Sequence, residues 1–127
     1  MSTDQQHFES VLEGVSRGST ADIKILLASL RPSEIAGVLE ANLPETRHII
    51  WGLIDEEVRN QSLQHLHDDV RGQFLETMDT AQLVAVAEEL DTDDFADILQ
   101  QLPETITNQV LESLDSRDRT RVESVLP

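Results

Sequence analysis

The sequence lacks cysteine and contains few aromatic residues. Its 127 residues include no Cys, no Tyr, one Trp and three Phe. Without Cys the chain has no disulfide framework, no thiolate nucleophile and no cysteine-ligated zinc site. A hydrophobic core must therefore consist mainly of Leu, Ile, Val and Ala. At this length one domain is the usual expectation, and we predict a single domain over residues 1–127.

Long apolar runs are also missing. The N-terminal sequence MSTDQQHFES has neither the positive charge nor the apolar run of a signal peptide. No stretch approaches the roughly 20 apolar residues that are needed to cross a bilayer. We therefore predict a soluble chain.

Basic residues are scarce as well. Nine Lys and Arg stand against 25 Asp and Glu, which gives a formal net charge of −16. Nucleic acids and anionic lipids select basic surfaces, so this charge argues against both as partners. From residue 72 to residue 116 there is no Lys or Arg, and 11 residues are acidic. Such a stretch is typical of a solvated surface, or of one that binds divalent cations or a basic partner.

The chain does contain a repeat of about 12 residues. An apolar residue followed by a turn-forming residue recurs at this interval, as at Met78-Asp79, Leu90-Asp91, Leu102-Pro103 and Leu114-Asp115. Between these points the apolar spacing is helical. Helices of about nine residues are marginal alone and must be buried against neighbours. The sequence therefore predicts an all-α fold, a superhelical stack of short helices.

Helix-start signals support this reading. Prolines fit the first turn of a helix, and aspartates fit the N-cap position; the residues concerned are Pro32, Pro44, Pro103, Asp79, Asp91 and Asp115. Two opening helices are predicted over residues 4–17 and 20–29. A longer similarity joins IAGVLEANLPET (35–46) to FADILQQLPET (95–105).

Signatures of enzymes are absent. The five glycines are scattered and form no phosphate-binding loop. His65 and His67 are two residues apart, so they do not share a helix face, and we expect them in a surface connector. Trp51 lies in an apolar run and is predicted to belong to the core. We predict that the protein is not an enzyme.

The segment LDTDDFADILQ (90–100) concentrates four aspartates. With Asp91 as the N-cap, Asp93 and Asp94 fall in the first helical turn, where negative charge is favourable. Asp97 does not. Asp93 and Asp97 lie opposite the apolar face, as an i, i+4 pair of like charge. They are either solvated surface acids or half of a site for a hard cation such as Mg²⁺. Because this face points away from the core, such a site is open and needs ligands from another surface.

The segments LRPSEIAGVLEAN, LPET and LDTDDFADILQQLPE resemble the amino-terminal cytosolic domain of MgtE-type magnesium channels, over about residues 5–127. The resemblance implies a cytosolic superhelix of short helices, followed by CBS domains and the pore of a homodimeric membrane protein. It also implies that Mg²⁺ bound between this domain and the CBS domains, of the same or the neighbouring subunit, favours the closed pore.

The resemblance also implies which residues bind the metal. The DD-x-A-D motif of the family matches residues 93–97, with Asp93 and Asp97 as the metal ligands and Asp94 beside them. Gln61 stands where the family has an acidic ligand of a second site, and Glu56 or Glu57 is a nearby substitute. We expect that residues 1–127 are an excised domain, because the family continues into the CBS domains.

A second class of function stays open. Repeats of short helices also resemble the middle domains of flagellar motor switch proteins. On this hypothesis the chain is a scaffold that binds a partner protein without metal.

Overall fold

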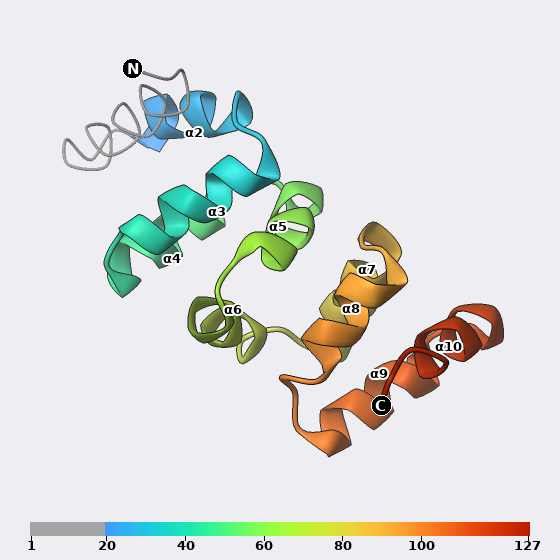
Figure 1. Ribbon diagram of the computed structural model, residues 1–127. Helices are drawn as coiled ribbons and strands as arrows, with labels where there is room; N and C mark the ends of the chain where they lie inside the picture. The colour runs from blue at the N-terminus through green and yellow to red at the C-terminus, as the bar shows by residue number, and fades with distance from the viewer. Residues whose placement is uncertain (1–19) are drawn as a thin grey trace. The chain divides into compact units, whose positions relative to one another are not determined.

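The computed structural model describes residues 20–127, which fold into helices only (Figure 1). The α-helices are α2 (Thr20–Ala28), α3 (Pro32–Ala41), α4 (Pro44–Gly52), α5 (Glu56–Ser62), α6 (Asp68–Leu75), α7 (Thr80–Glu89), α8 (Thr92–Leu99), α9 (Glu104–Ser113) and α10 (Ser116–Glu123), with a short 3₁₀ helix η1 (Leu63–His65) after α5. No strand occurs in these residues, which confirms the all-α prediction. The helix predicted over residues 4–17 lies outside the described part.

The helices begin at a constant interval. From α2 to α10, each first residue lies 12 positions after the previous one, at 20, 32, 44 and so on to 116. The α-helices are 7 to 10 residues long. The predicted repeat is therefore present as a repeat of helix starts. Their arrangement as a superhelix stays a prediction.

Most helix starts follow the predicted chemistry. Pro32 and Pro44 are the first residues of α3 and α4. Pro103 instead occupies the N-cap of α9, one position before the expected first turn. The carboxylates of Asp79 and Asp115 each accept a backbone N–H three residues on, at 2.8 Å. These bonds satisfy N–H groups that have no partner inside the helix.

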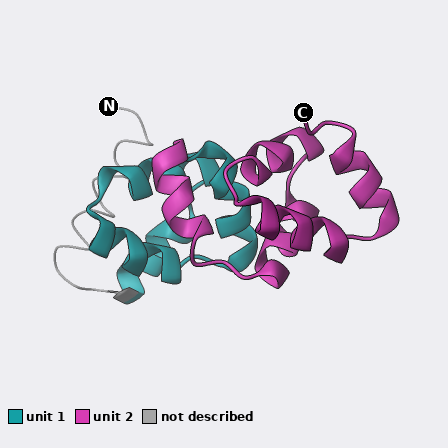
Figure 2. Cartoon of the chain, turned by 90° about the horizontal axis from the view of Figure 1, so that it is seen from below, with its two compact units in different colours: residues 1–66 teal, residues 67–127 magenta. Residues whose placement is uncertain are grey.

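The chain forms two compact units, residues 1–66 and 67–127 (Figure 2). The single domain predicted over residues 1–127 stays a prediction. In the first unit, α3 packs against α4, α5 and η1. Its buried side chains include Ile35, Leu39 and Ile50. The buried Arg47 guanidinium donates to the backbone oxygens of Leu39 (2.8 Å) and Asn42 (2.9 Å), and so caps the C-terminal end of α3.

In the second unit, α7 packs against α8 and α9, and α8 packs against α10. Buried Phe74, Phe95 and Ile98 contribute to its core. The buried Arg71 of α6 donates to the side-chain oxygen of Gln101, just after α8, and lies 3.1 Å from the Asp68 carboxylate. Because this network joins residues about 30 positions apart, it fixes the end of α8 against α6.

Two smaller predictions differ in outcome. His65 and His67 are exposed and lie between α5 and α6, which confirms the connector. The prediction that Trp51 belongs to the core is wrong, because its side chain is only partly buried. The guanidinium carbon of Arg59 lies 5.9 Å from the centre of the Trp51 ring, which is a cation–π contact.

Candidate functional site

Helix α8 is amphipathic. Burial of its apolar face determines which of its side chains point outward. Phe95, Ala96, Ile98 and Leu99 are each at most 3% exposed. Burying these side chains anchors the helix in the second unit and leaves little freedom for it to rotate. The side chains at the opposite positions must therefore face outward.

Asp93 and Asp97 occupy that outer face. Both are exposed, whereas Asp94 is partly buried. This confirms the orientation predicted from the helical period. Two carboxylates four residues apart lie side by side on a helix, and their like charges repel.

Asp91 takes the predicted N-cap position without the predicted hydrogen bond. It precedes the first residue of α8, but its side chain accepts no N–H of the helix. The expected capping is therefore wrong for this residue, although it holds for Asp79 and Asp115. Asp93 and Asp94 fall at the second and third helical positions, where their charge is favourable towards the helix dipole.

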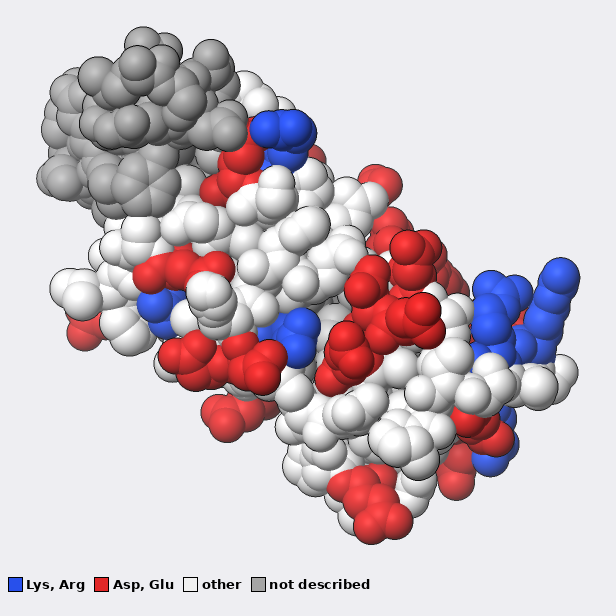
Figure 3. Space-filling view, in the orientation of Figure 1, with Lys and Arg blue, Asp and Glu red and all other residues white. Residues whose placement is uncertain are grey.

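The acids of α8 form no ion pair with a cation of residues 20–127. Within residues 20–127, the carboxylates of Asp91, Asp93, Asp94 and Asp97 form no hydrogen bond or ion pair. Figure 3 shows acidic side chains gathered over α7 and α8. A chemical role for this face therefore requires a cation from outside the described residues.

The face holds two suitable carboxylates rather than a closed metal site. No group of three or more His, Asp or Glu residues that could hold a metal occurs among residues 20–127. Mg²⁺ in proteins usually takes one or two carboxylates and keeps several water molecules, so a pair fits part of its coordination. Of the residues considered for a second site, Glu56 and Glu57 are exposed in the first turn of α5, and Gln61 is partly buried.

Helix α3 offers a comparison for α8 within the same chain. The two helices begin 60 residues apart, and their buried positions correspond one to one: Ile35, Ala36, Val38 and Leu39 against Phe95, Ala96, Ile98 and Leu99. At the outward positions α3 has Ser33 and Gly37 where α8 has Asp93 and Asp97. The same helical scaffold therefore forms without the acidic pair, so the fold does not require it.

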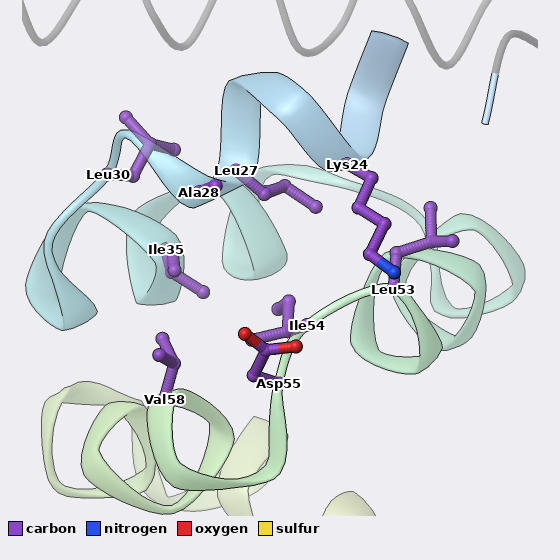
Figure 4. A pocket seen from close by; sticks show the side chains of 9 residues that line it. All are labelled: Lys24, Leu27, Ala28, Leu30, Ile35, Leu53, Ile54, Asp55 and Val58. Carbon is purple, nitrogen blue, oxygen red and sulfur yellow. The ribbon is translucent and has the colours of Figure 1, made fainter. Parts of the chain in front are cut away.

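A pocket in the first unit shows different chemistry (Figure 4). Its volume is about 130 Å³, and its walls are mainly aliphatic, with Ile35 and Ile54 among them. The charged residues that line it are Lys24 and Asp55. One cation and one anion among aliphatic side chains do not form a metal site, so the acidic face of α8 is the stronger candidate.

Residues 20–127 are thus all-helical, and the outer face of α8 presents an exposed pair of carboxylates of the kind that binds Mg²⁺. The chain belongs to the family of the MgtE intracellular N domain, whose family model matches residues 30–127. No curated protein matches the chain significantly.

Two solved structures are similar to the chain. The crystal structure of the cytosolic domain of the Mg²⁺ channel MgtE in complex with ATP is 25% identical, with a TM-score of 0.71, and the match covers 91% of this chain and 48% of that one. The crystal structure of the soluble part of a magnesium transporter is 16% identical, with a TM-score of 0.71, over 97% of this chain and 49% of that one. The second likeness shows the fold alone. The chain spans about half the length of each.

These comparisons confirm the family predicted from the repeat units, and with it the cytosolic location, since the family is that of an intracellular domain. It is a domain family of magnesium channels and not an enzyme family. No helix within residues 20–127 is long and apolar enough to span a membrane. The metal ligands Asp93, Asp97 and Asp94 stay a prediction.

Proposed function

We propose that this chain is the cytosolic regulatory domain of a magnesium channel or transporter and senses Mg²⁺ through the outer face of α8. In this proposal Asp93 and Asp97 bind the ion, with Asp94 beside them. The bound ion holds α8 against CBS domains of the same or the neighbouring subunit in a homodimer. The docked arrangement favours the closed pore, and release of Mg²⁺ favours the open one.

The observation that supports the proposal most directly is the exposed Asp93–Asp97 pair. Its carboxylates repel each other and form no ion pair within residues 20–127. They lie on the exposed face of α8, opposite the side chains that are buried in the core. A divalent ion between them removes that repulsion and replaces it with attraction. Membership of the MgtE N-domain family makes Mg²⁺ the expected ion.

Two carboxylates provide only part of a coordination shell. The isolated chain should therefore bind Mg²⁺ weakly, and the docking partner must supply further oxygen ligands. Binding of the metal and docking of the domains then raise each other's affinity by the same factor. Deleting the CBS domains should lower the affinity of the N domain for Mg²⁺.

The proposal is tested by Mg²⁺-dependent protection from protease in the full-length protein. The variant Asp93→Asn/Asp97→Asn should need a higher Mg²⁺ concentration for the same protection, and its channel should stay open at Mg²⁺ levels that close the wild type. The variant Glu104→Gln/Glu112→Gln removes two exposed charges from α9 and serves as a charge-matched control. Identical protection curves for the wild type and the α8 variant would refute the assignment.

Experiments on residues 1–127 alone complete the test. The single variant Asp97→Asn should be as stable as the wild type or slightly more stable. It removes the i, i+4 repulsion and keeps the favourable charge of Asp93 in the first turn of α8. Tight, saturable Mg²⁺ binding by this fragment would mean that the site is complete without a partner. If the domain contacts of the full-length protein do not change with millimolar Mg²⁺, the result would instead support the hypothesis of a metal-independent scaffold.

A further inference from the structure

Helix α10 carries every Lys and Arg that follows Arg71 in the sequence, namely Arg117, Arg119 and Arg121. The Glu123 carboxylate lies 2.7 Å from Nε of Arg119, and this hydrogen bond raises the pKa of that guanidinium. Arg121 is 4.0 Å from Asp118. Arg117 is exposed and forms no hydrogen bond or ion pair within residues 20–127.

The placement of Arg117 is unfavourable for α10 itself. It is the second residue of the helix, where the partial positive charge of the helix dipole repels a cation. It also forms an i, i+4 pair of like charge with Arg121. Neither arrangement stabilises the helix, so Arg117 is better explained by an anionic surface outside the described part of the molecule. Arg121 lies in the last turn, where the helix dipole favours a cation, and Asp118 is 4.0 Å from it.

An acidic surface lies next to this basic one. Helices α8 and α10 pack together, and Arg121 lines the same cavity as Thr92, the first residue of α8. Figure 3 shows the acidic side chains over α7 and α8 and, beside them, the arginines of α10. The second unit therefore presents acidic and basic halves on neighbouring helices.

A surface with adjoining halves of opposite charge is complementary to a copy of itself. A two-fold rotation places the acidic half of each copy on the basic half of the other, as in an isologous dimer. The spacing also matches, because both Asp93–Asp97 and Arg117–Arg121 are i, i+4 pairs. We propose that the second unit docks onto the second unit of another copy of this chain, with these arginines against these aspartates.

Other anionic partners fit the surface less well. Nucleic acids and anionic membranes bind extended basic surfaces, whereas α10 offers three arginines in a chain of net charge −16. A short acidic helix face matches this small surface. The helix α8 of a second copy is such a face.

The net charge predicts an unusual dependence on salt. At about 0.01 M salt the screening length is about 30 Å, so two copies of charge −16 repel as whole molecules. At about 0.15 M it falls to about 8 Å, which screens this repulsion while the contact pairs persist. At about 1 M, with a screening length of about 3 Å, the pairs weaken too. Self-association should therefore be strongest at intermediate salt.

Sedimentation velocity of residues 1–127 without Mg²⁺ tests the proposal over this salt range. The wild type should associate at high protein concentration and most strongly at intermediate salt. Arg117→Glu/Arg121→Glu and Asp93→Arg/Asp97→Arg should each weaken self-association at least about tenfold, because both contacts become repulsive. Mixing the two variants should restore a dimer, now a heterodimer, since both contacts are attractive again.

A single-residue control separates local contact from net charge. Arg117→Glu and Lys24→Glu change the net charge equally, but only the first should weaken association. A wild type that stays monomeric at every salt concentration would overturn the proposal, and so would two variants that fail to pair when mixed. Because Mg²⁺ and the CBS domains take no part, either result leaves the proposed Mg²⁺-dependent docking untouched.

Discussion

Gly37 and Asp97 occupy equivalent positions on the outer faces of α3 and α8, and each is locally unfavourable. Glycine inside a helix costs conformational entropy, and an aspartate four residues after another aspartate adds repulsion. Neither position contributes to the core. The two residues differ in what they offer the surface, since Gly37 presents bare backbone and Asp97 presents a charge.

Replacing Gly37 with Ala should stabilise the protein. A Cβ atom at this position meets no atom within 4 Å, and the residue is exposed within α3. Alanine should raise the free energy of unfolding by about 0.5–1 kcal/mol, as measured by urea denaturation. Gly52→Ala, at the last residue of α4, is the control and should gain less. A loss of stability would show that the outer face of α3 is covered.

At the scale of the element, α8 depends on its buried stripe. Leu99 is 1% exposed, so Leu99→Ala should lower the free energy of unfolding by about 2–5 kcal/mol. Leu43, just before α4, is 77% exposed and provides a matched control, for which we expect a change below about 0.5 kcal/mol. Both values come from chemical denaturation. Equal losses would mean that the assignment of the α8 face is wrong.

The sequence predicts those features of the helices that depend on neighbouring residues. The period of Phe95, Ile98 and Leu99 indicates the buried side of α8, because a helix repeats every 3.6 residues. The capping bonds of Asp79 and Asp115 also join residues only three apart. These features can be predicted because the residues involved are close together in the sequence.

Features that depend on residues far apart in the sequence could not be predicted in this way. The contact of Arg71 with Gln101 joins residues 30 positions apart, and no local pattern indicates it. Trp51 lies in an apolar run, yet its exposure depends on how α4 packs within the first unit. For the candidate site, the sequence indicated Asp93 and Asp97 through the helical period, whereas the free carboxylate of Asp91 required the structure.

At the scale of the whole molecule, charge is distributed unevenly. The 11 acidic residues from position 72 to position 116 have no Lys or Arg among them, and the folded second unit holds the whole of that stretch. Compact folding brings these charges together, so their repulsion opposes the native state.

Mg²⁺ should therefore raise the melting temperature of residues 1–127 more than NaCl of equal ionic strength does. A ligand that binds the folded state stabilises it by mass action, so the increase should continue until the ion saturates its sites. Thermal denaturation with each salt measures the difference, and excess chelator should reverse it. The variant Asp93→Asn/Asp97→Asn should show a smaller increase. Equal shifts in melting temperature with both salts would mean that Mg²⁺ acts only through ionic screening.

The constant interval between helix starts has a consequence for how this chain can change in length. Each helix and its short connector together occupy 12 residues, so an insertion or deletion of another size lengthens or shortens one helix or one connector and breaks the constant interval. A change of 12 residues preserves that interval. Natural relatives should therefore gain or lose whole units, and a designed protein of this type can be lengthened by inserting one complete 12-residue segment at a connector.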